Sequence, residues 1–423
     1  MNNFLTKIRL IFEDQNLRRR IFFVVGILAL TRLGAAIPMP GIDRFQLERA
    51  FSGDQFLGFL NIFSGGGLSN LSIFMLGVGP FITASIIIQL LTLIFPALKQ
   101  LYHEEGEMGR RKVAQYSRLL SIPLAAFQAI GLMVLLSNKG VLLPLSPVEK
   151  IISLIVVIAG SVLLMWLGEL ISEYGIGNGV SMIIFAGIVS RLPAITTQLA
   201  TTFEPTQIPL YLGFTAIALI ALAAVVFITE SERPIPVTYA KRVRGMKVYG
   251  GTSTYLPIRV NNAGVMPIIF AMSILLFPQM IANFLAGTSQ PVLKMMADFM
   301  LGFLSKTWLY GSAYFLLVVV FTYFYSAVTF DPEAISTNLQ KNGAFIPGVR
   351  PGHSTAVYIS KILTRLTLIG SLFLGVVALL PIILQSLTNM SSLAIGGTSL
   401  LIVVSVALDF IKQIDAQVSM REY

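Results

Sequence analysis

Long apolar stretches alternate with short polar connections along this chain. Ten apolar segments reach or approach the length of about 20 residues that an α-helix needs to cross a bilayer. They lie near residues 21–37, 72–95, 118–136, 151–167, 179–195, 208–229, 262–285, 308–329, 362–386 and 393–411. The pattern predicts an all-α polytopic membrane protein with ten transmembrane helices.

Helix breakers interrupt several of these segments. The second contains "GVGPFITAS" (77–85), and the seventh contains "VMPIIF" (265–270). Breaks of this kind are tolerated in a membrane where the helix faces other protein or a water-filled cavity. We therefore expect both places to be enclosed by protein or to line a cavity.

Composition agrees with a membrane protein and disfavours a soluble enzyme. The 423 residues are 55% hydrophobic and 12% charged, with a mean hydropathy of +0.80, whereas soluble domains carry about 25% charged residues. There is no cysteine, which excludes disulfides and thiolate sites. The N-terminus is polar up to Arg20 and the first apolar segment leads into proline-rich sequence, so we expect no cleavable signal peptide.

The net charge of +10 is distributed unevenly between the two sets of alternate connections. Most lysines and arginines fall in the set that contains the two termini and residues 230–261 and 331–358. Cytoplasmic loops gather these residues, so both termini and both long loops are expected in the cytoplasm. The connection 168–178, with two glutamates and no lysine or arginine, departs from the pattern.

The ten segments divide into two groups of five near residue 200. An odd number in each group places the second group upside down relative to the first, as in an inverted repeat. The expected halves are residues 1–200 and 201–423, related by pseudo-symmetry, with a functional path between them.

The stretch "NIFSGGGLSN" (61–70) resembles a phosphate-binding loop only superficially. Topology places it outside, and no lysine follows the glycines as a P-loop requires. A flexible surface loop remains possible, but the flanks "FLGFLNIF" and "LSNLSIFML" are strongly apolar. A short helix hinged by glycine and folded back into the membrane, a re-entrant segment, explains these flanks.

A few polar side chains lie within apolar segments. Three amides, Gln89, Gln128 and Asn261, lie in or at the ends of these segments. They are expected either to hydrogen-bond between helices or to line a functional path between them. Charged residues are scarce there, with Arg32 near the outer end of the first segment and Asp409 near the inner end of the last. Ion pumps place carboxylates or histidines at membrane depth, so this scarcity disfavours ion coupling.

Chemistry of other kinds finds little support. His103, Glu104, Glu105 and Glu107 form the one cluster resembling metal ligands, but it lacks a paired histidine and adjoins basic residues. A solvated loop is the better interpretation. No nucleophile and base can be paired, so we expect no catalytic residues, no metal and no cofactor.

Both long cytoplasmic loops carry exposed basic residues. The alternation around Val243–Gly245 predicts a hairpin with a basic tip, and "NGAFIPGVRPG" (342–352) holds Arg350 between glycines and prolines. Such residues can simply set orientation or touch anionic lipid. The size of the loops also favours docking of a nucleic acid or a protein.

Several long motifs resemble the SecY family, the channel subunits of the bacterial Sec translocase, which is related to the alpha subunit of the endoplasmic-reticulum translocon. The motifs are "NIFSGGGLSNLSIF" (61–74), "SIIIQLL" (85–91), "EGEMGRRKVAQYSR" (105–118), "MWLGELISEYGIGNGVSMIIFAGIV" (165–189), "NLQKNGAFIPGVRPG" (338–352) and "GGTSLLIVV" (396–404). The motifs occur in the family's order, and the resemblance runs through all ten segments and both long loops.

The resemblance assigns roles to residues. Residues 59–70 take the place of the plug, a short helix that closes the channel from outside, with its centre at Asn61, Ile62, Phe63, Ser64, Gly65, Gly66, Gly67 and Leu68. The aliphatic ring that seals the pore falls on Val78, Ile82, Val180, Ile184, Ile269 and Ile402. The polar residues of the lateral gate match Gln89, Gln128 and Asn261. Docking of the motor or ribosome falls on Lys241, Arg242, Arg244 and Arg350.

The resemblance also implies a function. It implies a passive channel that moves unfolded preproteins across a membrane and releases apolar segments sideways into lipid. The implied partners are the SecE and SecG subunits, the SecA motor ATPase, the ribosome, signal peptides with their preproteins, and membrane lipid. The expected location is the bacterial plasma membrane rather than the thylakoid. The rival interpretations are a secondary transporter for a small solute and an intramembrane enzyme.

Overall fold

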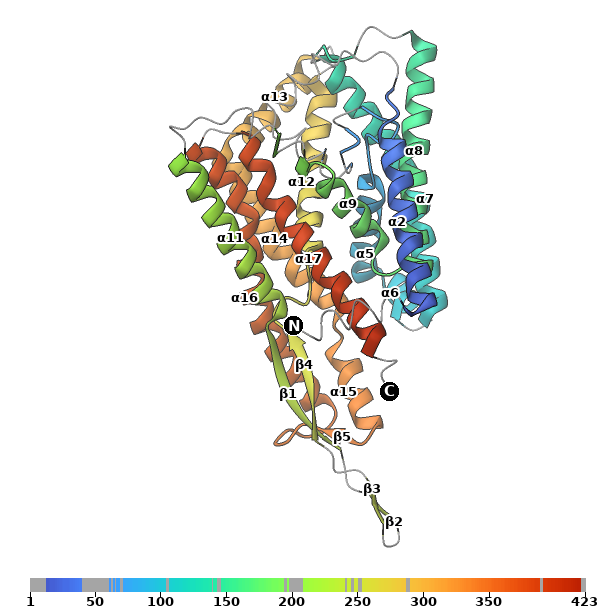
Figure 1. The fold of residues 1–423 in the computed structure, drawn as a ribbon, viewed down its shortest axis with the longest axis vertical. Coiled ribbons are helices and arrows are strands. Elements are labelled where there is room, and N and C mark those ends of the chain that lie inside the picture. The colour runs from blue at the N-terminus through green and yellow to red at the C-terminus, as the bar shows by residue number, and fades with distance from the viewer. Residues whose placement is uncertain are drawn as a thin grey trace. The chain divides into compact units, whose positions relative to one another are not determined.

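The computed structural model describes most of the 423 residues. The described residues are 13–39, 61, 64, 66–68, 71–103, 106–138, 140–142, 146–193, 196–197, 208–239, 242–244, 247–249, 253–286, 290–388 and 391–419. Helices dominate this part of the chain, and strands occur between residues 232 and 259 and at 344–345 (Figure 1).

Each of the ten apolar segments contains a helix. These helices are α2 (Gln15–Ala35), α5 (Gly79–Ile94), α7 (Gly106–Asn138), α8 (Pro147–Tyr174), α9 (Gly179–Val189), α11 (Ile208–Glu230), α12 (Met266–Ala286), α14 (Thr307–Thr329), α16 (His353–Thr388) and α17 (Ser391–Ser419). By length and composition, six helices among the described residues can cross a membrane: α7, α8, α11, α12, α14 and α16. Helix α5 and the following α6 (Pro96–His103) meet at a bend of 109° and would together make a seventh. The chain is therefore a multi-pass membrane protein.

Several helices extend beyond the apolar segments. Helix α8 continues to Tyr174 before its C-cap at Gly175, so the expected loop 168–178 is wrong over residues 168–174. Helices α7 and α16 begin well before their apolar segments. Hydropathy marks where a helix meets lipid, whereas the helix itself ends where its backbone pairing stops. Two further helices, α13 (Pro291–Ser305) and α15 (Pro332–Lys341), occupy connections where the hydropathy pattern predicted none.

The chain forms two compact units. The first comprises residues 1–216, 272–311 and 380–423, and the second comprises residues 217–271 and 312–379. This grouping follows packing density and not symmetry. The pseudo-symmetric halves that meet near residue 200 stay a prediction.

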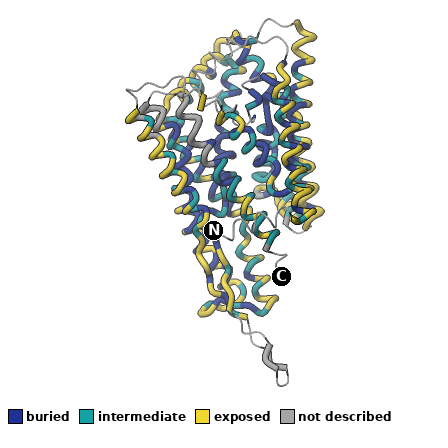
Figure 2. Tube along the Cα trace, in the orientation of Figure 1, coloured by how far each residue is buried: buried dark blue, intermediate teal, exposed yellow. Residues whose placement is uncertain are grey.

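In the first unit, α8 packs against α2, α5, α7 and α9, and α17 packs against α9. Small residues of α8 permit these close approaches, since a Cβ atom at Gly168 would lie only 3.3 Å from Val180. Figure 2 shows buried and exposed residues alternating along α7 and α8, as expected for helices with one face on protein. The buried apolar cluster of this unit includes Leu68, Leu71, Leu136 and Val157.

The second unit carries a small antiparallel sheet beyond the end of α11. Strand β1 (Glu232–Tyr239) lies between β4 (Ser253–Arg259) and β5 (Ala344–Phe345). Farther out, β2 (Arg242–Arg244) pairs with β3 (Lys247–Tyr249), with Val243 opposite Val248 (Figure 1). The predicted basic hairpin is confirmed, and β1 and β4 extend it into a longer arm.

Candidate functional site

The Gly-containing segment is held by hydrogen bonds of its own. Residue 61, residue 64 and residues 66–68 are described, and residues 66–68 lie in turns. The Ser64 hydroxyl donates to the Asn61 carbonyl at 3.1 Å and accepts from the Leu68 amide at 2.9 Å. The Ser72 amide donates to the Gly67 carbonyl at 2.9 Å. Ile62, Phe63 and Gly65 lie outside the described residues, as do the ends of the expected plug helix.

Glycines allow neighbouring backbones to approach this segment closely. A Cβ atom at Gly67 would lie 2.6 Å from the Phe74 carbonyl oxygen. On α2, a Cβ atom at Gly34 would overlap the Phe74 ring, and on α8, one at Gly160 would overlap the Ile73 carbonyl oxygen. Leu68 is fully buried. Ile73 and Phe74 thus lie against both α2 and α8, and Gly67 packs on Phe74.

Adding a methyl group at Gly160 should displace this segment. We expect Gly160→Ala to destabilise the protein by about 1–3 kcal/mol, because backbone at Ile73 has little room to shift. The measurement is the thermal unfolding midpoint of the purified protein in detergent. Gly26→Ala is the matched control, since a Cβ atom at Gly26 of α2 meets nothing within 4 Å. Equal midpoints for both variants would contradict the tight packing.

Two arginines lie over the turn at Gly66. Arg32 Nη1, from the last turn of α2, donates to Ser190 Oγ at 3.0 Å. The same nitrogen and the Arg191 Cδ atom each lie 3.8 Å from where a Cβ atom at Gly66 would stand, and Gly66 has φ +88°. Arg191 Nη1 is buried and has no hydrogen-bond partner among the described residues. Sequence reasoning missed this arrangement because 158 positions separate Arg32 from Ser190.

The six predicted ring residues are aliphatic and mostly buried. Val78 is the N-cap of α5, and Ile82 lies one turn farther along the same helix. The buried members are Val78, Ile82, Ile184, Ile269 and Ile402, while Val180 is half-buried at the start of α9. All except Ile269 belong to the first unit. Their joint role as a ring stays a prediction.

Gln89 and Gln128 both lie in the first unit, on α5 and α7. Gln89 Nε2 donates to Ser85 Oγ at 3.3 Å, and Gln89 Oε1 is buried without a partner in the described part of the chain. Gln128 is buried, and its Oε1 lies 3.9 Å from where a Cβ atom at Gly79 would stand. Gln128 therefore reaches from α7 to the start of α5.

Helix α7 also packs directly against the second part of α12. The rings of Phe127 and Phe277 stack with their centroids 5.9 Å apart. Met280 Cε lies 3.4 Å from where a Cβ atom at Gly131 would stand. Beside them is a cavity of ≈ 10 Å³, which matches one water. Its lining includes Gln128 and Asn283, and Asn283 Nδ2 has no partner among the described residues. An amide in an apolar segment was the signal that could have identified Asn283.

Asn261, the third predicted gate residue, lies in the second unit. It precedes α12 and is buried, and its Oδ1 atom lacks a partner within the described ranges. The neighbouring Val260 carbonyl approaches Gly370 of α16, where a Cβ atom would stand 2.8 Å from it. The structure brings Gln89 and Gln128 onto adjacent helices, and it places Asn261 in another compact unit.

The loop that holds Arg350 is rigidly organised within the second unit. Gly348 and Gly352 adopt φ of +82° and +95°, a conformation that favours glycine. The Arg350 carbonyl accepts a hydrogen bond from Thr355 Oγ1 at 2.9 Å, and the Gly352 carbonyl accepts one from Ser336 Oγ at 2.6 Å. The Arg350 side chain is exposed. Arg242 and Arg244 lie on β2, and Lys241 lies outside the described residues.

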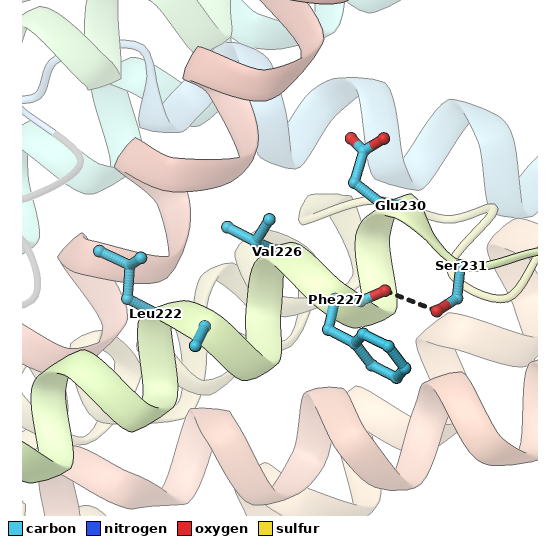
Figure 3. Close-up of a pocket in the computed structure, with 6 residues that line it drawn as sticks. Leu222, Val226, Phe227, Glu230 and Ser231 are labelled. Atoms are coloured by element: carbon cyan, nitrogen blue, oxygen red, sulfur yellow. Dashed lines mark hydrogen bonds between the residues drawn. The ribbon is translucent and has the colours of Figure 1, made fainter.

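The structure gives little support for a metal site or a small-ligand pocket among the described residues. No group of three or more potential metal ligands occurs among the described residues, which include His103 and Glu107 but not Glu104 or Glu105. A hollow of ≈ 550 Å³ lies at the end of α11 (Figure 3). It is lined by one helix and its end, including Leu222, Phe227 and Ser231, with Ser231 Oγ bonded to the Phe227 carbonyl. A one-sided apolar hollow offers no converging polar groups to fix a ligand.

Comparisons with known proteins decide the family. The SecY family matches residues 72–411 of this chain. Protein translocase subunit SecY of Mycobacterium tuberculosis is 42% identical over 428 residues, which cover 96% of this chain and 96% of that protein. The chain belongs to the SecY family.

Solved structures support the SecY fold. One similar structure is a SecY protein whose plug domain is reported to stabilise the closed state of the translocation channel and to maintain a membrane seal. Its TM-score is 0.64 at 20% identity, and the match covers 95% of this chain and 92% of that one. Canine Sec61 in a ribosome-channel complex from the endoplasmic reticulum has a TM-score of 0.58 at 18% identity, with the same coverage. The predicted ten-helix SecY fold is confirmed.

Proposed function

We propose that this chain is a protein-conducting channel that translocates unfolded preproteins and releases apolar segments laterally into lipid. The observation that carries the proposal is the packing of residues 66–68 and 71–78. Local turns and close glycine contacts hold these residues against α2 and α8, so they can move without breaking a long helix or a sheet. Such a segment suits a plug, and the named relatives of the chain are translocase subunits and channels.

The ring of aliphatic residues supplies a seal that does not discriminate between sequences. Side chains such as Ile82 and Ile184 form no hydrogen bonds with a passing chain, and a hydrophobic constriction resists ions by dewetting. No chemical step is needed, so the channel is not an enzyme. The energy for transport comes from a partner.

The proposed lateral gate lies between the helices that carry Gln89, Gln128 and Asn261. The contact of α7 with α12 through Phe127, Phe277 and Met280 supports this placement of the gate. An apolar segment that enters lipid gains roughly 0.3–0.6 kcal/mol for each Leu, Ile, Phe or Val at its centre. Partitioning alone can therefore drive its release when these helices part.

The proposed partners are SecE and SecG as companion subunits, SecA as the motor, and the ribosome. A related Sec61 channel occurs in a ribosome complex, which supports a ribosome contact. Arg350 and the basic residues of the hairpin would bond rRNA phosphate or partner carboxylates. Signal peptides, preproteins and lipid are the remaining ligands.

The decisive test of this function is transport. The chain with SecE and SecG in lipid vesicles, given SecA and ATP, should carry a labelled precursor into a protease-protected lumen. Vesicles without ATP serve as the control. Uptake of a small solute without any precursor transport would favour the transporter interpretation instead.

We further propose a location in the bacterial plasma membrane with both termini in the cytoplasm. The chain has no cysteine, so single cysteines report topology. Pro347→Cys in the Arg350 loop should resist an impermeant thiol reagent in intact cells, whereas Lys306→Cys before α14 should react. Both residues are exposed. Labelling at position 347 in intact cells, with none at position 306, would reverse the orientation.

A further inference from the structure

Helix α13 connects α12 to α14 and has three distinct faces. Leu293, Ala297, Met300, Leu301 and Leu304 recur at the spacing of one helix face, and all are buried or half-buried. This face packs on the protein.

A second, equally apolar face of α13 is uncovered. It consists of Val292, Met295, Met296, Phe299 and Phe303, which again follow helical spacing. All five are exposed, and the exposed fraction is 77% for Met295 and 76% for Phe299. Scattered exposed hydrophobics are ordinary, but a contiguous row along about three helical turns marks a surface that another apolar phase covers.

Between these two apolar faces runs a narrow polar strip. It contains Lys294, Asp298 and Ser305, spaced so that they fall on one line along the helix. A helix that lies in water would expose a broad polar surface. One that lies in a membrane interface beside its own protein needs a polar surface only toward the aqueous side.

The connections of α13 favour lipid as the occupant. Helix α14, which follows after Lys306, is long and apolar enough to cross a membrane, and so is α12 before it. The 15 residues of α13 span about 22 Å at about 1.5 Å each, less than the ~30 Å of a bilayer core. Trp308 in the first turn of α14 is 91% exposed, and tryptophan concentrates where a span meets the headgroups.

We propose that α13 is an interfacial anchor that inserts its Val292–Phe303 apolar face into the lipid leaflet where α12 and α14 emerge. Lys294 and Lys306 are placed to reach lipid phosphates while their aliphatic stems stay among apolar groups. The anchor fixes the connection between α12 and α14 to the membrane surface. It depends on the membrane location of the chain and not on the channel function.

The test uses single cysteines in the full-length, cysteine-free chain reconstituted in nanodiscs. Phe299→Cys on the uncovered face and Asp298→Cys on the polar strip receive the same environment-sensitive fluorophore. Two sets of lipids are compared, one with the quencher near the headgroup, at a depth of about 5–10 Å, and one with the quencher at the end of the acyl chain. The label at 299 should be quenched more by the first set than by the second. The label at 298 should instead be quenched by aqueous iodide.

A native readout covers the case in which a cysteine variant fails to fold. The chain has two tryptophans, so Trp166→Phe leaves Trp308 as the sole emitter. Trp308 should be quenched by lipids brominated near the headgroup. Iodide quenching at 299 equal to that at 298 would show a water-facing helix and overturn the proposal. Protection of 299 from both lipid and iodide would show a protein partner or a second copy, and would overturn it as well.

Discussion

Replacing Ile82 and Ile184 together with glycine should make the resting channel leak ions. Both side chains are buried, on α5 and α9 of the first unit, and both are predicted members of the pore ring. Removing them widens a constriction that excludes ions by staying dry. We expect conductance in planar bilayers to rise from near zero to a level visible in single-channel recordings without any precursor present.

The control for this prediction is a pair of neighbouring isoleucines on the same helices. Ile86 and Ile183 are also buried, and their replacement with glycine costs the helices a similar amount of stability. The control pair should stay sealed. If both pairs leak equally, general loosening of the helices explains the current and the ring assignment fails. If neither pair leaks, the seal lies elsewhere.

Arg350→Glu should cripple preprotein transport while leaving membrane insertion intact. The side chain is exposed on a loop whose glycines and hydrogen bonds are already in place, so little order is lost when a partner binds. Charge reversal sets like charges against a carboxylate or phosphate, and we expect affinity for SecA or ribosomes to fall on the order of 100-fold. The salt dependence of ribosome binding should become shallower as phosphate contacts are lost.

Arg259→Glu is the matched charge reversal for that experiment. Arg259 is exposed on β4 in the same unit, and its reversal changes the net charge of the chain by the same amount. Transport and binding should be nearly unchanged. The measurement combines precursor protection in vesicles with equilibrium binding of SecA and ribosomes. Wild-type behaviour of Arg350→Glu would remove the docking role, and equal loss in both variants would reduce it to general electrostatics.

Fold class could be derived from the sequence because lipid imposes a simple rule. Backbone polar groups must pair within each membrane segment, so ten apolar segments imply helices, and each contains one. The basic hairpin could also be predicted, because alternating residues around a turn specify the strand register locally. The ends of the helices could not be predicted from such local patterns. Helix α8 runs on to Tyr174 since backbone pairing continues past the apolar stretch.

Hydropathy, local alternation and the quoted motifs are enough to predict the membrane class, the ten helices, the hairpin and the SecY family. What surrounds residues 66–68 and 71–78 depends on tertiary packing. The close approach of Gly160 to Ile73, and of Arg32 and Arg191 to Gly66, joins residues far apart in the chain. The half-buried position of Asn283 beside Gln128 and the uncovered face of α13 likewise depend on which helix lies opposite. Local pattern fixes each helix, but contacts between distant segments form only when the chain packs.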